Sequence, residues 1–175
     1  MPLISLITGG ARSGKSRHAL ELGDGYAKRT FIATAEPIDD EMRARIDAHV
    51  ARRGESWITV EEPLDLAGAV GDLGHDVDVA VIDCVTVWLG NLLHHVDSPA
   101  AVSGAIDAFI ETLADPPCDL IVVTNEVGAG IVPATPLGRR FRDLAGETNQ
   151  RMARAADRVV VMFSGIPVLV KAETS

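Results

Sequence analysis

The chain has 175 residues, of which 47% are hydrophobic and 23% charged, a balance typical of one soluble globular domain with a sizeable core. Its formal net charge of −9 argues against a nucleic-acid partner bound through a general basic surface, although a nucleotide needs only a local positive pocket. No apolar run approaches the roughly 20 residues that span a bilayer, and a glycine-rich motif begins before residue 10, so neither a membrane span nor a signal peptide is expected.

Apolar runs alternate with helical patterns along the chain, which favours βαβ units and a mostly parallel sheet. The predicted strands are residues 3–8, 29–34, 57–61, 77–83, 120–124, 159–163 and 168–171. The predicted helices are residues 15–28, 37–53, 63–73, 86–95, 100–113 and 137–156. The last two strands close the chain as a hairpin around residues 164–167. No linker, repeat or low-complexity tract interrupts the pattern, so we expect a single domain over residues 1–175.

Two cysteines, Cys84 and Cys118, border apolar runs and lack CxxC spacing. We interpret them as buried, reduced thiols, which is typical of a cytoplasmic protein.

The first predicted strand leads into the sequence GGARSGKS at residues 9–16, which has the spacing of a phosphate-binding loop. Glycines allow positive φ angles and let backbone N–H groups surround an anion, and the following helix adds the positive end of its dipole. Lys15 is expected to reach the β- and γ-phosphates, and the Ser16 hydroxyl to complete a Mg²⁺ shell. The alternative is a glycine-rich turn that only joins a strand to a helix. The strand, the helix and the Lys-Ser pair together favour nucleotide binding.

Asp83 ends an apolar strand, where a carboxylate at the carboxyl edge of the sheet can hold Mg²⁺ directly or through water. Many buried strands end in Asp, so this pattern is informative only together with the phosphate loop.

His49 lies at the edge of the apolar stripe of its predicted helix, one turn from both Arg45 and Arg53. A histidine flanked by arginines near a phosphate site could contact phosphate or attack phosphorus as a nucleophile. Spacing alone favours an ordinary hydrogen-bonded histidine at a helix border.

Residues 124–136 form a predicted loop with two glycines and two prolines, at the carboxyl end of a strand where α/β sheets bind ligands. Glu126 is its only carboxylate. This side chain could contact substrate or metal, or it could be a solvated loop acid, and the sequence favours neither.

Five segments together resemble the bifunctional adenosylcobinamide kinase/adenosylcobinamide-phosphate guanylyltransferase family of cobalamin biosynthesis. They are GGARSGKS at 9–16, FIATA at 31–35, DEM at 40–42 with the histidine at 49, TNEVGAGIVP at 124–133, and residues 141–150. The phosphate loop is shared with many families, whereas TNEVGAGIVP combined with the DEM helix is far more specific. The resemblance covers nearly the whole chain and implies a three-layer α/β P-loop NTPase fold similar to RecA.

The resemblance implies two reactions at one site. A nucleoside triphosphate, GTP or ATP, phosphorylates the aminopropanol hydroxyl of adenosylcobinamide. GTP then guanylylates His49 with release of pyrophosphate, and the GMP passes to adenosylcobinamide phosphate to give adenosylcobinamide-GDP. The family also tends to form homo-oligomers such as trimers. A P-loop small-molecule kinase without guanylyl transfer is the alternative.

By position in these motifs, the implied catalytic residues are His49, Lys15 and Ser16. The implied nucleotide contacts are Gly9, Gly10, Ala11, Arg12, Ser13, Gly14, Lys15, Ser16, Ala33, Thr34, Ala35, Val50, Ala51, Arg52, Arg53, Glu61 and Asp83. Mg²⁺ is the expected cofactor, with Ser16 and Asp83 as its protein ligands. Arg52 or Arg53 could stabilise charge on the transferred group. The sequence assigns no general base to the kinase step.

Overall fold

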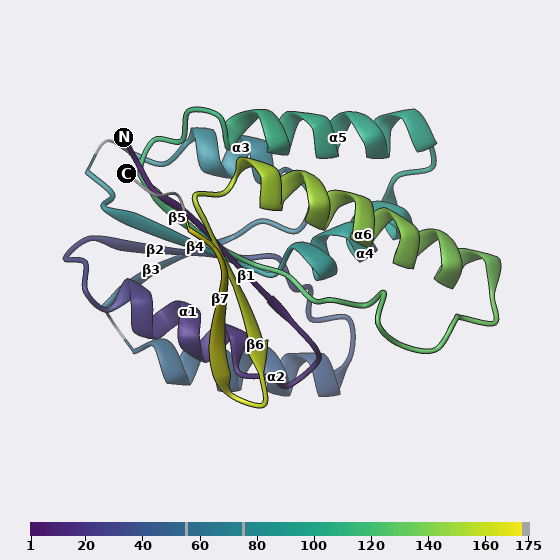
Figure 1. Cartoon of the computed structure of the whole chain (residues 1–175), viewed down its shortest axis with the longest axis horizontal. Helices are drawn as coiled ribbons and strands as arrows, with labels where there is room; N and C mark the ends of the chain where they lie inside the picture. Colours follow the sequence, from purple (N-terminus) through teal and green to yellow (C-terminus); the bar gives the residue numbers. More distant parts are fainter. Residues whose placement is uncertain (55, 75, 173–175) are drawn as a thin grey trace.

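A seven-stranded sheet in the order β3-β2-β4-β5-β1-β6-β7 forms the centre of the computed structural model (Figure 1). The structure describes residues 1–54, 56–74 and 76–172, apart from the side chains of Glu41, Met42, Arg45, Ala48, His49 and Arg52. The strands are β1 (Ile4–Gly9), β2 (Arg29–Ala33), β3 (Trp57–Glu61), β4 (Val79–Asp83), β5 (Asp119–Val123), β6 (Arg158–Phe163) and β7 (Ile166–Ala172). The first six strands are parallel, and β7 pairs antiparallel with β6 as the predicted closing hairpin.

Helices cover both faces of this sheet, so the molecule has three layers (Figure 1). The helices are α1 (Lys15–Gly23), α2 (Asp40–Arg53), α3 (Leu66–Gly71), α4 (Val85–His95), α5 (Pro99–Thr112) and α6 (Pro136–Ala155). The first two lie on one face and the other four on the opposite face. Among the described residues, no helix is long and apolar enough to cross a membrane.

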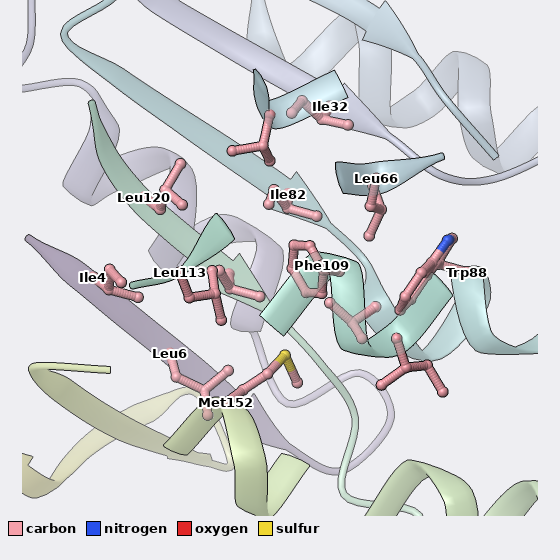
Figure 2. Packing of buried hydrophobic residues seen from close by; sticks show 14 of the residues in the cluster. Ile4, Leu6, Ile32, Leu66, Ile82, Trp88, Phe109, Leu113, Leu120 and Met152 are labelled. Atoms are coloured by element: carbon pink, nitrogen blue, oxygen red, sulfur yellow. The ribbon is translucent and has the colours of Figure 1, made fainter. Parts of the chain in front are cut away.

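The larger core cluster fills the space between the sheet and helices α3 to α6 (Figure 2). Trp88 and Phe109 are fully buried there, with an edge-to-face contact of 5.4 Å between ring centroids. The Trp88 indole N–H donates to the carbonyl of Leu64 at 2.7 Å, so burial leaves no polar group of this ring unpaired. A smaller cluster under α1 includes Phe31 and Trp57.

Side-chain caps place most helix starts close to the predicted residues. Ser98 and Thr135 cap α5 and α6, and each is followed by proline in the first turn. Several boundaries differ from the prediction by a few residues, and local contacts explain two of them. The helix α3 begins at Leu66, because the Asp65 carboxylate accepts from the Gly68 N–H at 2.9 Å. The helix α1 ends five residues early, at Gly23 rather than at residue 28.

The early end of α1 follows from the packing at Gly23. A β-carbon at this position would lie 2.4 Å from the Trp57 ring, so the helix end is pressed against β3. Asp24 then ion-pairs with Arg29 at 2.6 Å, which turns the chain directly into β2.

Strand register brings the predicted site residues to one edge of the sheet. Ala33 lies opposite both Glu61 and Asp83, and Asp83 lies opposite Val123. Val123 in turn pairs with Ile7, two residues before the phosphate loop. The strand β5 therefore separates the phosphate-loop strand β1 from the Asp83 strand β4.

Candidate active site

The phosphate loop has backbone angles that glycine accommodates. Gly9 has φ 145° and Gly14 has φ 97°, both in the range that L side chains rarely adopt. A β-carbon on Gly9 would also lie 2.6 Å from the carbonyl oxygen of Met162 on β6. In the turn between β6 and β7, the Gly165 N–H donates to the Ser13 carbonyl at 3.0 Å. The β6–β7 hairpin thus holds the loop in shape from one side.

Lys15 lies inside this loop. Its ammonium donates to the carbonyl of Gly10 at 2.6 Å, and the residue is only 7% exposed. Burial lowers the pKa of Lys15, while the charges of Cys84 and Asp83 act in the opposite direction. The positive charge is therefore held where a bound phosphate would lie, and its loss of hydration makes an incoming anion more favourable.

A second cation, Arg53, lies near the ends of β2, β3 and β4. Its guanidinium stacks over the Phe31 ring at 3.8 Å and donates to the Thr59 hydroxyl at 3.4 Å. Burial lowers the pKa of Arg53, and the nearby carboxylates of Asp83 and Glu61 raise it. The structure thus brings together three of the residues predicted to bind nucleotide, Arg53, Glu61 and Asp83.

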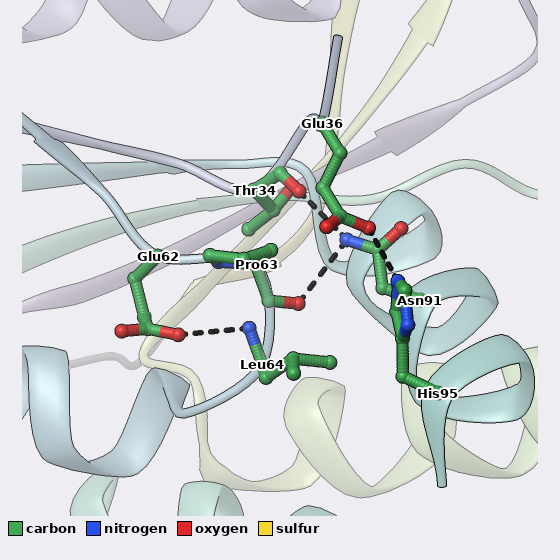
Figure 3. Close-up of polar contacts among 7 residues, drawn as sticks. All are labelled: Thr34, Glu36, Glu62, Pro63, Leu64, Asn91 and His95. Atoms are coloured by element: carbon green, nitrogen blue, oxygen red, sulfur yellow. Dashed lines mark hydrogen bonds and ion pairs between the residues drawn. The ribbon is translucent and has the colours of Figure 1, made fainter. Parts of the chain in front are cut away.

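Thr34 is fully buried, and its polar groups are hydrogen-bonded within the protein. Its hydroxyl accepts from the Cys84 N–H at 2.8 Å and donates to the Cys84 carbonyl at 2.9 Å. Its carbonyl accepts from the Asn91 amide at 2.8 Å, which also donates to Pro63 at 3.1 Å (Figure 3). The Thr34 side chain therefore fixes the end of β4, and only its half-buried neighbours Ala33 and Ala35 lie nearer the surface.

A further polar pair lies beside these residues. His95, the last residue of α4, makes a 2.8 Å contact with the carboxylate of Glu36 (Figure 3). Both side chains are partly exposed. This pair ties the end of α4 to the segment that follows β2.

The loop after β5 is fixed by a buried network that the sequence did not predict. The Thr124 hydroxyl donates to Asn149 at 2.8 Å and lies 3.0 Å from the Thr86 hydroxyl. The Thr86 hydroxyl accepts from the Asn125 N–H at 2.7 Å, and the Asn149 amide donates to the Asn125 carbonyl at 3.1 Å. The next residue, Glu126, donates its N–H to the Gly9 carbonyl at 3.0 Å. The start of this loop is thereby attached to the phosphate loop. Asn149 lies within residues 141–150, one of the segments that carried the family resemblance. Its place in that segment was the sequence feature that could have pointed to it.

The helix α2 carries the predicted histidine. Arg53 ends this helix at the site, and His49 precedes it by one helical turn on the backbone. The side chains of His49 and Arg52 lie outside the described residues. Val50 is half-exposed and Ala51 exposed. The roles predicted for these four residues therefore stay predictions.

Two oxygen donors suit Mg²⁺ at this edge. Ser16 lies in the first turn of α1, and Asp83 ends β4. In the described part of the chain, no group of three or more His, Cys, Asp or Glu side chains could hold a metal by itself. A hydroxyl and one carboxylate fit Mg²⁺, which commonly takes one or two protein oxygens together with substrate phosphates and water.

The sequence model of the family described as "Cobinamide kinase / cobinamide phosphate guanyltransferase" (CobU) matches residues 5–170. The chain belongs to this family. Two curated relatives match nearly the whole chain. CobP of Pseudomonas aeruginosa is 43% identical over 170 residues, covering 96% of this chain and 97% of that protein. CobU of Escherichia coli K12 is 41% identical over 181 residues, covering 97% and 100%. Both are described as bifunctional adenosylcobalamin biosynthesis proteins.

Among solved structures, the RadB recombinase superposes on this CobU-family chain with a TM-score of 0.53 at 14% identity. The match covers 98% of this chain and 81% of RadB. At this identity the likeness concerns the fold alone, and it confirms the predicted RecA-like P-loop architecture. Family membership likewise confirms the resemblance drawn from the five sequence segments.

Proposed function

We propose that this protein is a bifunctional cobinamide kinase and cobinamide phosphate guanylyltransferase, acting in the cytoplasm. The observation that carries the proposal is an intact phosphate loop, with Lys15 buried inside it and near Asp83, in a chain of the CobU family. GTP or ATP would donate phosphate, and adenosylcobinamide and its phosphate would be the acceptors.

In the kinase step, the backbone N–H groups of residues 9–16 hold the β-phosphate, and Lys15 neutralises charge on the γ-phosphate. Catalysis here depends mainly on in-line positioning and charge neutralisation. Ser16 and Asp83 would hold Mg²⁺, which when bound supplies positive charge to the phosphate oxygens.

In the guanylyl step, the neutral imidazole of His49 attacks the α-phosphorus of GTP. The new bond joins an imidazole nitrogen to phosphorus, the bond to the α–β bridging oxygen breaks, and pyrophosphate leaves. The GMP then passes to the phosphate oxygen of adenosylcobinamide phosphate, which restores the free histidine. Arg53, stacked on Phe31, would stabilise charge on the transferred group.

One phosphate loop would serve both steps. The kinase step presents the γ-phosphate to the acceptor, whereas the guanylyl step presents the α-phosphate to His49. The triphosphate therefore has to shift along the loop, or α2 has to move relative to it. Two separate nucleotide sites in a ligand-bound structure would contradict this proposal.

Incubation with α-labelled GTP tests the guanylyl step. We expect an acid-labile label on the wild-type protein that is absent from the His49→Ala variant. His94→Ala removes an exposed histidine of α4 and is the control that keeps the label. An active kinase that takes up no label would instead be a P-loop small-molecule kinase without guanylyl transfer.

We also propose a homo-oligomer, such as a trimer. The edge strand β7 exposes the apolar residues Ile166, Val168, Leu169 and Val170, each at least 46% exposed. An apolar edge strand of this kind favours association. Light scattering of the purified protein would give the number of subunits, and a monomer would contradict this part of the proposal.

A further inference from the structure

A cavity of about 270 Å³ opens between the sheet and α6, next to the phosphate loop. Its apolar wall comes from β1, β6 and α6, and its polar groups come from β1, α6 and the loop after β5. The residues that matter here are Leu6, Ala153 and Val159 in the wall, and Glu126, Asn149 and Gln150 among the polar groups. None of these six residues belongs to the motifs that bind the triphosphate.

The position of Glu126 in this cavity is fixed by its backbone. Its N–H bonds to the Gly9 carbonyl, and the two preceding residues are held by the network of Thr86 and Asn149. Its carboxylate is exposed, and one oxygen accepts from the nearby Gly128 N–H at 3.2 Å. The side chain is thus accessible to a ligand, while hydrogen bonds fix the backbone from which it extends.

Three other carboxylates at this edge of the sheet are near a positive or ionisable partner. Glu36 contacts His95 at 2.8 Å, and Glu61 and Asp83 lie close to Arg53. Within the described residues, Glu126 has no ion pair. A carboxylate that no cation engages keeps its oxygens available to accept a hydrogen bond from an incoming hydroxyl.

We infer that this cavity receives the hydroxyl-bearing arm of the acceptor, and that Glu126 is the general base of the kinase step. This inference rests on the proposed function. The arm combines a hydroxyl, an amide and short hydrocarbon segments, which match the carboxylate, the Gln150 amide and the apolar wall of the cavity.

In this step the O–H bond of the acceptor breaks, and its proton passes to the Glu126 carboxylate. The acceptor oxygen forms a bond to the γ-phosphorus, while the bond from that phosphorus to the β–γ bridging oxygen breaks. The nucleoside diphosphate leaves, and the acceptor becomes its phosphate ester. General-base assistance of this kind typically contributes about 10²- to 10⁴-fold.

Chemical rescue of the Glu126→Ala variant tests the assignment. With adenosylcobinamide and ATP, we expect the kinase turnover of this variant to be lower than that of the wild type by about 100-fold or more. Added formate should raise the turnover of the variant at least tenfold. Labelling by α-labelled GTP should stay within twofold of the wild type, because that step does not use Glu126. Glu147→Ala, which removes an exposed carboxylate from α6, is the matched control and should change neither activity.

Two outcomes would overturn the inference. One is turnover of Glu126→Ala within fivefold of the wild type. The other is a loss that formate does not relieve, which would show that Glu126 only supports the loop. If the wild-type protein neither phosphorylates adenosylcobinamide nor takes up the GTP label, the proposed function itself fails, whatever the variants do.

Gln150→Ala tests the cavity separately from the base. We expect the KM for adenosylcobinamide to rise about three- to tenfold, which is the effect of losing one hydrogen bond, with the KM for ATP unchanged. An unchanged KM for both substrates would place the acceptor arm outside this cavity.

Discussion

Gly9 is the position where the structure makes the sharpest demand on residue type. Its φ of 145° is in a region that only glycine adopts without strain, which costs another residue about 1–3 kcal/mol. A β-carbon would also lie 2.6 Å from the Met162 carbonyl oxygen, and this contact is with backbone that cannot rotate away. Forcing such a contact costs about 1–3 kcal/mol more. We therefore expect Gly9→Ala to lower the free energy of unfolding by about 2–6 kcal/mol.

Gly10 provides the matched control for this prediction. A β-carbon there would meet nothing within 4 Å, and its φ is not in the positive range. Gly10→Ala should therefore change the free energy of unfolding by less than about 1 kcal/mol. Both variants are measured by urea unfolding without nucleotide, because a bound ligand would add stability of its own. The error of such a measurement is about 1 kcal/mol. If the free energies of unfolding of Gly9→Ala and Gly10→Ala differ by no more than that, the clash with β6 does not exist.

Three further predictions concern polar groups that are hydrogen-bonded within the fold. Lys15→Met should lower the affinity for triphosphate at least tenfold, measured by calorimetry. Its free energy of unfolding should stay within about 1 kcal/mol of the wild-type value, because the substitution removes a desolvated charge. Thr34→Val should lower the free energy of unfolding by about 1–3 kcal/mol, because the buried Cys84 N–H loses its partner, whereas Thr34→Ser should keep most of the stability. The Tyr26 hydroxyl donates to Asp119 at 2.5 Å, and this bond is the main cause that raises the pKa of Tyr26 to about 12. Because the folded pKa exceeds the ordinary tyrosine value of about 10, this contribution is complete below pH 10 and is lost as the pH rises towards 12. The melting temperature of Tyr26→Phe should therefore fall less over that range than the melting temperature of the wild type.

The phosphate loop could be predicted from sequence because its chemistry depends on neighbouring residues. Gly9, Gly14, Lys15 and Ser16 lie within one turn of chain, and the spacing itself requires the strand before them and the helix after them. Asp83 was predictable for a similar reason, since an apolar strand that ends in a carboxylate delivers it to the carboxyl edge of a parallel sheet. Both buried cysteines were also predictable from their apolar surroundings, and both are free thiols in the structure, where burial raises the pKa of each to about 11.

Contacts between distant residues were not predictable in this way. The family resemblance implies a nucleotide contact at Thr34, but the sequence gives no sign that its hydroxyl bonds to Cys84, 50 positions away. The hydroxyls of Thr86 and Thr124 meet across 38 positions. Neither pairing follows from local spacing, because both depend on which strands lie side by side. The end of α1 at Gly23 has the same origin, since it is fixed by Trp57 on β3 rather than by helix propensity.

The position of β5 explains why these distant contacts matter for the site. This strand lies between β1, which carries the phosphate loop, and β4, which carries Asp83, and it pairs in register with both. Any residue that follows β5 is therefore next to the ends of both of these strands, whatever its own type. Thr86 and Asn149 fix the first residues after β5, and the Glu126 N–H joins them to the phosphate loop. An acceptor held by this loop would be aligned with the triphosphate by the sheet itself, which is the positioning that phosphoryl transfer requires.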